Sequence, residues 1–341
     1  MNITKTTLLR YLIGTVVCAF SAQTISAEGT KLPYWKDIQT VAVNKEAPRT
    51  AFMSYDNSGQ ALTGKYENSP YYKLLNGKWN FYYVDAYKDL PANIEQPGAD
   101  ITWKKSMYPQ LGVQGLWNSH LYQSAIRFPA QQPATSAFAR ANPVGVYQRD
   151  IEIPSNWDGR DIYLRLEGAK SGVYVYLNGK EVGYSEDSKN PAEFLINKYL
   201  QPGKNSLVVK CFRYSTGSYL ECQDFWRLSG IERDVFLFSQ PKTAVQDFEV
   251  VSTLDDTYKN GIFKLDVNVT NHTAANKNVT VTYELLDADK KVVTSAETPC
   301  NVSADGKNTV TFNASLNNVK TWTSEQPNLY KLLISLKEDG K

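Results

Sequence analysis

Three carboxylate side chains lie close together between residues 186 and 193, within the stretch EVGYSEDSKNPAEF (181–194). They belong to Glu186, Asp187 and Glu193. Because the stretch follows a predicted hairpin strand, we expect these residues in a loop at the edge of a sheet, where binding groups are common. A carboxylate there can accept hydrogen bonds from two sugar hydroxyl groups, or bind a hard cation such as Na⁺ or Mg²⁺. The same residues would also suit a solvated surface loop, so both interpretations stand.

A second group of charges lies between residues 217 and 238, in the stretch GSYLECQDFWRLSGIERDVFLF. Its charged members alternate with large aromatic residues, and they are Glu221, Asp224, Arg227, Glu232, Arg233 and Asp234. Charges this close to aromatic rings predict half-buried ion pairs, which would fix a junction between domains. Two of the carboxylates could instead act as the acid and nucleophile of a glycosidase, which must lie about 5 Å apart. Spacing along the chain does not give that distance.

The composition argues against several other classes of function. The only histidines are His120 and His272, so a histidine-based metal site is not expected. A serine hydrolase is not expected either, because no G-x-S-x-G motif is present. The net charge is +2 and no basic block stands out, so electrostatics gives no reason to expect a nucleic-acid partner.

Residues 1–27 have the pattern of a secretory signal peptide. Lys5 and Arg10 form a positive start, residues 11–20 are apolar but too short to span a bilayer, and Ala27 ends a small-residue cleavage site. We therefore expect a secreted or periplasmic protein. No later stretch is long and apolar enough to predict a membrane segment.

Beyond that segment the chain has three cysteines, Cys211, Cys222 and Cys300. This number is odd and too small for a disulfide scaffold. Cys211 and Cys222 could pair in an oxidising compartment, or they could be small buried thiols. The residues alone leave that choice open.

The elements that would position these groups are predicted to be strands. Residues 162–168 alternate apolar and polar side chains, which predicts a strand with one buried face and one wet face. Residues 173–184 contain Asn178-Gly179, the strongest short signal for a hairpin, since a type I′ turn requires positive φ at both positions. Residues 205–214 alternate as well, and no segment keeps a helical period.

The character of the sequence changes near residue 240. Ser239-Gln240-Pro241-Lys242 interrupts the strand pattern, and the following residues are rich in Thr, Asn and Val. Alternating runs then recur at 264–270, 279–286, 309–312 and 331–336. We therefore predict an all-β chain with two β-sandwiches, at residues 28–240 and 241–341.

At residues 218–235, SYLECQDFWRLSGIERDV, the sequence resembles glycoside hydrolase family 2, specifically its large β-galactosidases. The stretch GYSEDSKNPAEF (183–194) resembles the same branch, and VNKEAPR, LNGKWNF and WTSEQPNLYKLLISL match the family in the same order. The resemblance implies a jelly-roll, galactose-binding-like β-sandwich followed by an immunoglobulin-like β-sandwich and then a catalytic TIM barrel.

The resemblance further implies a retaining β-galactosidase that hydrolyses terminal β-galactosides in carbohydrate catabolism, through an acid/base glutamate and a nucleophilic glutamate on the barrel. A TIM barrel needs about 250 residues, and the sequence stops at Lys341. We therefore expect this chain to be non-catalytic by itself, to contain no catalytic residue, and to act with a barrel domain that it lacks. A homo-oligomer is compatible with the family. The alternatives are a stand-alone carbohydrate-binding module and an inactive truncated fragment.

Asp187 is the one site residue that the resemblance transfers. In the resembling enzymes, the matching aspartate reaches the active site, contacts the galactosyl group and helps to hold a sodium ion. We therefore expect Asp187 to bind substrate and, only in a full-length protein, to ligate Na⁺. No cofactor is expected in this chain alone, whereas Na⁺ and Mg²⁺ are implied for the full enzyme. A family asparagine in a sugar-contacting loop falls at Ala125, which puts strict galactose selectivity in doubt.

Overall fold

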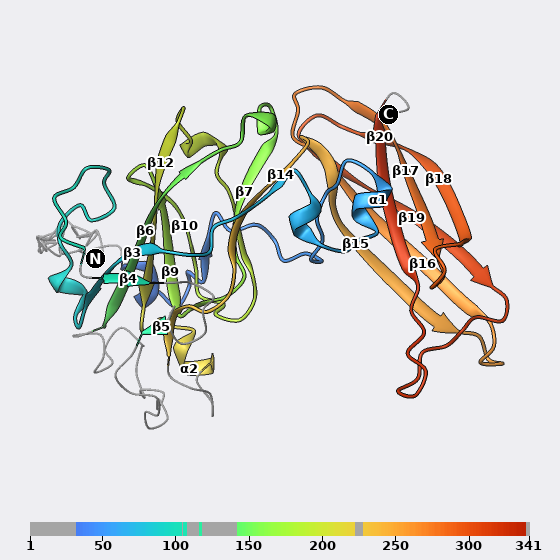
Figure 1. Ribbon diagram of the computed structural model, residues 1–341, viewed down its shortest axis with the longest axis horizontal. Helices are drawn as coiled ribbons and strands as arrows, with labels where there is room; N and C mark the ends of the chain where they lie inside the picture. The colour runs from blue at the N-terminus through green and yellow to red at the C-terminus, as the bar shows by residue number, and fades with distance from the viewer. Residues whose placement is uncertain (1–31, 104, 108–115, 118–141, 222–227, 339–341) are drawn as a thin grey trace, which may run out of the picture. The chain divides into compact units, whose positions relative to one another are not determined.

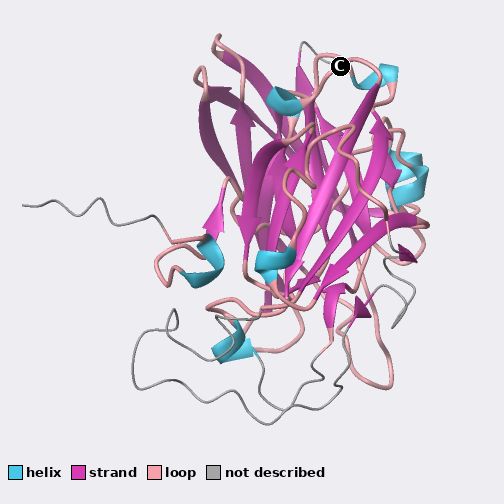
Figure 2. Cartoon of the chain, turned by 90° about the vertical axis from the view of Figure 1, so that its left-hand side faces the viewer, coloured by secondary structure: helices cyan, strands magenta, loops and turns pink. Residues whose placement is uncertain are grey.

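The computed structural model describes residues 32–103, 105–107, 116–117, 142–221 and 228–338 (Figure 1). Strands make up nearly all of its regular structure, as Figure 2 shows in magenta. The described helices are single turns: α1 (Ser58–Ala61), α2 (Ser218–Glu221), η1 (Tyr34–Lys36), η2 (Tyr66–Asn68), η3 (Tyr87–Asp89), η7 (Ser155–Trp157) and η8 (Asn197–Tyr199). None of them is long and apolar enough to span a bilayer. The prediction of an all-β chain is confirmed.

The first β-sandwich consists of a large sheet packed face to face against a smaller one. The seven strands of the large sheet run in the order β1 (Ala42–Val43), β10 (Lys180–Ser185), β9 (Gly172–Leu177), β12 (Lys204–Phe212), β6 (Val144–Glu152), β3 (Trp79–Val84) and β4 (Lys105–Met107). The opposing sheet has the order β11 (Ala192–Leu195), β7 (Asp161–Leu166), β14 (Val235–Gln240) and β2 (Tyr72–Leu74). A third, short sheet joins β5 (Leu116–Trp117), β13 (Ser229–Ile231) and β8 (Ala169–Lys170). Most neighbours are distant in the sequence, as in a jelly roll.

The predicted hairpin lies between β9 and β10. Asn178 and Gly179 have φ values of 53° and 76°, and Leu177 pairs with Lys180 across them. The Asn178 side chain then fixes the turn to its neighbours. Its Oδ1 accepts from the Ser206 amide at 3.0 Å, and its Nδ2 donates to the Tyr199 carbonyl at 2.9 Å. The turn type is thus set locally, while its place on the sheet depends on β12.

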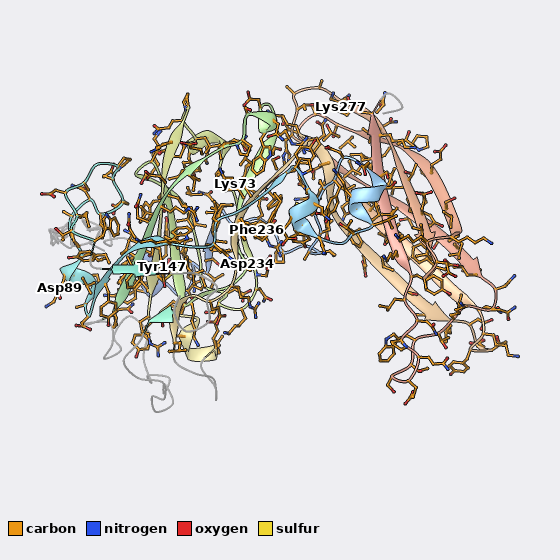
Figure 3. All side chains as sticks on the ribbon, viewed as in Figure 1. Lys73, Asp89, Tyr147, Asp234, Phe236 and Lys277 are labelled. Carbon is orange, nitrogen blue, oxygen red and sulfur yellow. The ribbon has the colours of Figure 1, made fainter. Side chains whose placement is uncertain are left out.

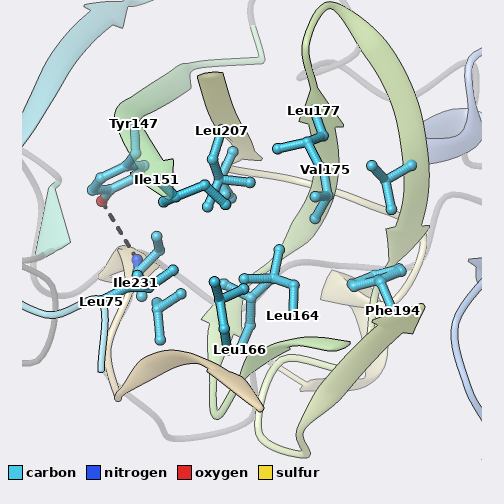
Figure 4. Close-up of a cluster of buried hydrophobic side chains, with 14 of the residues drawn as sticks. Leu75, Tyr147, Ile151, Leu164, Leu166, Val175, Leu177, Phe194, Leu207 and Ile231 are labelled. Carbon is cyan, nitrogen blue, oxygen red and sulfur yellow. Dashed lines mark hydrogen bonds between the residues drawn. The ribbon is translucent and has the colours of Figure 1, made fainter. Parts of the chain in front are cut away.

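The core of the first sandwich lies between its seven-stranded and four-stranded sheets (Figure 4). Alternate residues point inward, so that Phe81, Val175 and Leu207 face Leu164 and Phe194 across the gap. A hydrogen bond of 3.4 Å from the Ile231 amide to the Tyr147 hydroxyl crosses the same region (Figure 4). Replacing one of these phenylalanines by alanine would cost about 3–5 kcal/mol, because the cavity could close only in part.

Strand β7 is buried on both faces, so the predicted wet face is wrong. Tyr163 and Arg165 point away from the core, yet they are only 7% and 4% exposed. Tyr163, Phe236 and Phe238 form a second apolar layer with Met53, whose segment is distant in the sequence. The alternation therefore predicts the strand correctly, but it contains no information about the segment that covers the outer face.

The outer face of the seven-stranded sheet is covered as well. Trp35 and Ile94 belong to one buried apolar cluster with Val146, Val208 and Phe212 from β6 and β12. Trp35 stacks on Phe212 with ring centroids 5.6 Å apart. The segment around η1 and the loop after β3 thus act as lids over this face of the sheet.

The second β-sandwich begins directly after the first. Strand β14 ends at Gln240, and β15 (Thr243–Leu254) starts after Pro241 and Lys242. Its sheets are β15–β16 (Gly261–Asn271)–β19 (Gly306–Leu316) and β18 (Val292–Val302)–β17 (Lys277–Leu286)–β20 (Lys331–Glu338). Leu265, Val267, Val281 and Phe312 meet in its core. This six-stranded arrangement is immunoglobulin-like and agrees with the predicted fold class.

Candidate functional site

The acidic loop starts where β10 ends, and its first two carboxylates have opposite environments. Glu186 is 3% exposed, whereas Asp187 is exposed to solvent. Successive residues of an extended chain point to opposite sides, so one neighbour turns inward and the other outward. The structure therefore separates two residues that the sequence could not tell apart.

Glu186 is the buried anchor of the loop. Its Oε2 accepts hydrogen bonds of 2.6 Å from both the Thr216 hydroxyl and the Gly217 amide, and its Oε1 accepts one of 2.6 Å from the Tyr184 hydroxyl. Burial raises the pKa of the Glu186 carboxyl, and the hydrogen bonds from Thr216, Tyr184 and Gly217 oppose that rise. Burial, followed by the neighbouring Glu186 carboxylate, also raises the pKa of the Tyr184 hydroxyl.

Asp187 presents its carboxylate to solvent at the tip of the loop. Both of its oxygens accept from the amide nitrogen of Asn190, at 3.2 and 2.9 Å. Each oxygen keeps lone-pair capacity for a further donor. The side chain is thus oriented by its neighbour while it remains able to accept hydrogen bonds from two hydroxyl groups of a ligand.

The two charged stretches singled out in the sequence meet at this loop. Glu221 in α2 binds both the amide (3.0 Å) and the hydroxyl of Ser188. Glu232 pairs with the Lys189 ammonium at 2.6 Å, and the Arg233 guanidinium donates to the Lys189 carbonyl at 2.9 Å. Glu221, Glu232 and Arg233 therefore hold residues 188–189 of the same sandwich in place.

Glu193 does not belong to the exposed site. It lies in β11 at 6% exposure, and the guanidinium groups of Arg49 and Arg165 both bind it. Arg49 contacts both carboxylate oxygens, at 2.8 and 2.9 Å. Arg165 also pairs with Glu167 at 2.7 Å. The expectation that Glu193 lies in the loop is therefore wrong, since this carboxylate joins the segment before η2 to the four-stranded sheet.

Asp234 also has a structural contact, because its Oδ1 accepts from the Asn76 side-chain amide at 2.6 Å (Asp234 is labelled in Figure 3). Several other residues named in the sequence lie outside the described part of the chain. These are the signal-peptide residues 1–27, His120, Ala125, Cys222, Asp224 and Arg227. Cys211 is a free, buried thiol, and burial raises its pKa.

Sequence reasoning did not single out Thr216 and Gly217, which hold Glu186. Their signal was weak, since a Thr-Gly pair before residue 218 looks like an ordinary turn. A cluster of serines lies beside them. The Ser171 hydroxyl is 2.9 Å from that of Ser215 and 2.8 Å from that of Ser218. These small polar residues fill the space below the loop.

Around Asp187 the described residues gather no cluster of acidic, histidine or cysteine side chains. Hard cations such as Mg²⁺ and Ca²⁺ take about six oxygen ligands. Asp187 supplies one carboxylate, and the nearby Asn190 turns its amide nitrogen toward it. Across the described ranges, no three His, Cys, Asp or Glu residues come together in a way that could hold a metal ion.

Comparison with known proteins gives consistent matches over the whole folded part. Residues 72–241 match the family model described as glycosyl hydrolases family 2, sugar binding domain, and residues 243–341 match glycosyl hydrolases family 2. A β-galactosidase of Priestia megaterium is 33% identical over 322 residues, which cover 92% of this chain and 31% of that protein. A β-galactosidase of Halalkalibacterium halodurans is 31% identical, covering 91% of this chain and 30% of that protein. The chain thus spans about 30% of the length of these curated relatives.

Solved structures show the same fold at lower identity. A calcium-binding mutant of β-glucuronidase 2 from Bacteroides uniformis has a TM-score of 0.64 at 19% identity, covering 79% of this chain and 31% of that one. A putative β-galactosidase from Bacteroides fragilis has a TM-score of 0.59 at 18% identity, covering 80% of this chain and 39% of that one. At these identities the likeness concerns the fold alone.

Proposed function

The chain belongs to glycoside hydrolase family 2, and from that premise we propose that it is the non-catalytic front part of a secreted, retaining β-galactosidase. The substrates would be terminal β-galactosides. A retaining glycosidase needs an acid/base carboxylate and a nucleophilic carboxylate at a separation of about 5–5.5 Å. In this proposal both would come from a barrel domain outside this chain. This chain would contribute sugar contacts and no reacting group.

The observation that supports the proposal best is the construction of the loop at the end of β10. An exposed carboxylate, Asp187, is placed directly after a buried one, Glu186, which receives three hydrogen bonds of 2.6 Å. A side chain that must bind a sugar in one orientation gains from such a fixed base, because little conformational entropy is then lost on binding. A solvated surface loop would not require it.

In this proposal Asp187 accepts hydrogen bonds from galactosyl hydroxyl groups, and Asn190 keeps the carboxylate turned toward the substrate. Lys189 does not face the sugar, since Glu232 holds its ammonium at 2.6 Å. The loop therefore presents one net negative group. Its contribution is to bind and orient the substrate, and the proton transfers belong to the barrel.

The test uses the product of the complete reading frame and a chromogenic β-galactoside. We expect hydrolysis by this product and none by the 341-residue chain alone. Asp187→Asn should lower kcat/KM by roughly 10- to 100-fold, since hydrogen bonds to a charged group are worth about 1.5–3 kcal/mol. Asp256→Asn, at an exposed aspartate of the second sandwich, is the matched control and should leave kcat/KM unchanged.

Three results would contradict the proposal, each at a different point. A stop codon directly after Lys341, with no barrel encoded in the same locus, would remove the enzyme. Hydrolysis of a β-glucuronide in place of the β-galactoside would keep the glycosidase and overturn its substrate. If Asp187→Asn and Asp256→Asn gave equal kcat/KM values, Asp187 would have no part in substrate binding.

A further inference from the structure

A pocket of about 410 Å³ opens on the outer face of the seven-stranded sheet. This volume falls within the roughly 300–1,000 Å³ of typical small-molecule sites. The pocket lies where the lids end, between the loop after β3 and the strands β6 and β12. Asp89, which is labelled in Figure 3, lies at the start of that loop. The pocket has an aromatic wall, which is Trp103, and a floor of polar side chains from β6 and β12.

The floor of the pocket is a fixed ladder of hydrogen bonds across neighbouring strands. The Gln148 side-chain oxygen accepts from Asn80 Nδ2 at 2.7 Å, and its nitrogen donates to Asp150 Oδ1 at 3.0 Å and to Ser206 Oγ at 3.3 Å. These bonds use both amide hydrogens of Gln148 and one lone pair of its oxygen. They leave the second oxygen of Asp150 and the hydroxyl proton of Ser206 for a ligand.

Lys204 completes the floor with a donor. It is exposed, and no carboxylate of the described residues lies within ion-pairing distance of its ammonium. A carboxylate acceptor and an ammonium donor therefore face the same space. A sugar hydroxyl can donate to the first and accept from the second.

The wall opposite the floor is apolar and well anchored. Trp103 is half-buried and packs edge-on against Tyr82, with centroids 6.5 Å apart at 85°. Ile94 is 3% exposed and fixes the loop to the sheet. The amide of Gln96 donates to the Gly179 carbonyl at 3.1 Å, which ties the loop to the β9–β10 hairpin. The wall is thus held in position before any ligand arrives.

We propose that this pocket is a second carbohydrate-binding site, which takes a neutral mono- or disaccharide. A pyranose has an apolar face for Trp103 and hydroxyl groups for Asp150, Ser206 and Lys204. A phosphate would need more cations than the single lysine of the lining. A fully apolar ligand would leave the floor groups buried without partners, which is unfavourable.

The pocket is separate from the Asp187 loop. It reaches the β9–β10 hairpin at Asn178, whereas Asp187 follows the other end of β10. The six residues of β10 span roughly 20 Å at about 3.3 Å per residue. The proposal therefore does not depend on the hydrolase activity, and it would hold for a chain without a barrel.

The experiment measures binding of galactose, lactose and cellobiose to the 341-residue chain, by saturation-transfer NMR and calorimetry at millimolar sugar. We expect at least one of these sugars to bind. Asp150→Asn keeps the acceptor for Gln148 and removes the charge, and it should weaken binding by about tenfold. Trp103→Ala should weaken it at least as much. Trp322→Ala, at a tryptophan that is 62% exposed, is the matched control and should bind as the unchanged chain does.

Asp187→Asn and Asp150→Asn distinguish the two sites, because a sugar held in the pocket depends on Asp150 and a sugar held at the acidic loop depends on Asp187. Absence of binding for all three sugars would overturn the pocket. Binding that is lost in Asp187→Asn but retained in Asp150→Asn would also overturn it, and would place the sugar at the acidic loop. If Trp103→Ala fails to fold in thermal melts, the Asp150→Asn result decides.

Discussion

Glu186 and Asp187 are adjacent in the chain, but they differ in what surrounds them and therefore in what they can do. Glu186 receives three hydrogen bonds and is nearly inaccessible, while Asp187 has one amide neighbour and faces solvent. A buried carboxyl with a raised pKa affects stability through its protonation. An exposed one affects binding through its lone pairs. The loop thus divides a structural task and a proposed binding task between two neighbours.

The raised pKa of Glu186 predicts a pH dependence of stability. The folded protein holds the proton more tightly than the unfolded chain, whose glutamates have their ordinary pKa of 4.5. The stabilising contribution is therefore fully present below pH 4.5, and it is lost as the pH rises through the folded-state pKa. Glu186→Gln should remove this loss, because a glutamine oxygen can still accept from Thr216 and Gly217.

The measurement is the free energy of unfolding by urea across pH 4 to 8. We expect the unchanged chain to lose stability with rising pH more steeply than Glu186→Gln does. Glu284→Gln, at an exposed glutamate of β17, is the control and should follow the unchanged chain. Parallel curves for the unchanged chain and Glu186→Gln would mean that Glu186 does not titrate differently on folding.

The sequence could not predict that Glu186 and Asp187 would have different environments. Asp-Glu runs in a loop predict solvent exposure, and nothing local distinguishes one carboxylate from the next. The partners of Glu186 are Thr216 and Gly217, thirty residues further along, and only the folded sheet brings them to it. The family resemblance singles out Asp187, but it does not reveal the buried base on which that residue stands.

At the scale of elements, the ion pairs around Glu193 join an early segment to the four-stranded sheet. The side chains of Arg49, Arg165 and Glu193 are 8%, 5% and 7% exposed. Removing one partner of a buried ion pair leaves an uncompensated charge and costs about 3–5 kcal/mol. We therefore expect Glu193→Ala to lower the free energy of unfolding by that amount, as measured by urea denaturation.

The control for Glu193→Ala is an exposed pair of similar chemistry. Lys277 and Glu338 are 2.6 Å apart, but their side chains are 30% and 45% exposed. Such pairs contribute about 0–1 kcal/mol, so Glu338→Ala should change stability little. Equal losses in the two variants would show that the Glu193 pairs add no more than a surface contact.

Alanine substitutions at two glycines test how the β9–β10 hairpin is anchored. Gly179 and Gly203 have nearly the same φ, 76° and 77°, where a side chain is strained by about 1–3 kcal/mol. A Cβ at Gly203 would meet no atom within 4 Å, whereas one at Gly179 would lie 2.2 Å from the Gln96 side-chain oxygen. Gly203→Ala thus measures backbone strain alone. Gly179→Ala should cost about 1 kcal/mol more, because Gln96 must also give up its bond to the turn.

That difference is accessible to thermal or urea unfolding of the two variants under the same conditions. Equal costs would mean that Gln96 moves aside freely and does not anchor the loop after β3. The hairpin itself was predictable, because Asn178-Gly179 encodes its turn in two adjacent residues. The covering of β7 was not, since Met53 and its neighbours are brought over Tyr163 only by the tertiary fold.

At the scale of the whole molecule, the folded part reaches almost to the predicted cleavage site. Trp35 lies eight residues after Ala27 and is 4% exposed. It stacks on Phe212, meets Tyr87 edge-on at 5.3 Å, and donates its backbone amide to the Tyr174 hydroxyl at 3.3 Å. Losing this side chain would cost about 3–5 kcal/mol. We therefore predict that any processing of the chain leaves Trp35 in place.

An exported chain that keeps Trp35 must be cleaved upstream of that residue. We expect the chain, when expressed in a bacterium with a secretion system, to leave the cytoplasm and to begin at Glu28 by intact-mass and N-terminal analysis. Val17→Arg places a charge in the apolar run 11–20, so it should block export and leave residues 1–27 attached. A mature chain that begins after Trp35 would contradict the packing, because the lid over β12 would be lost. A mature chain that retains residues 1–27 after export would contradict the signal peptide and leave the packing intact.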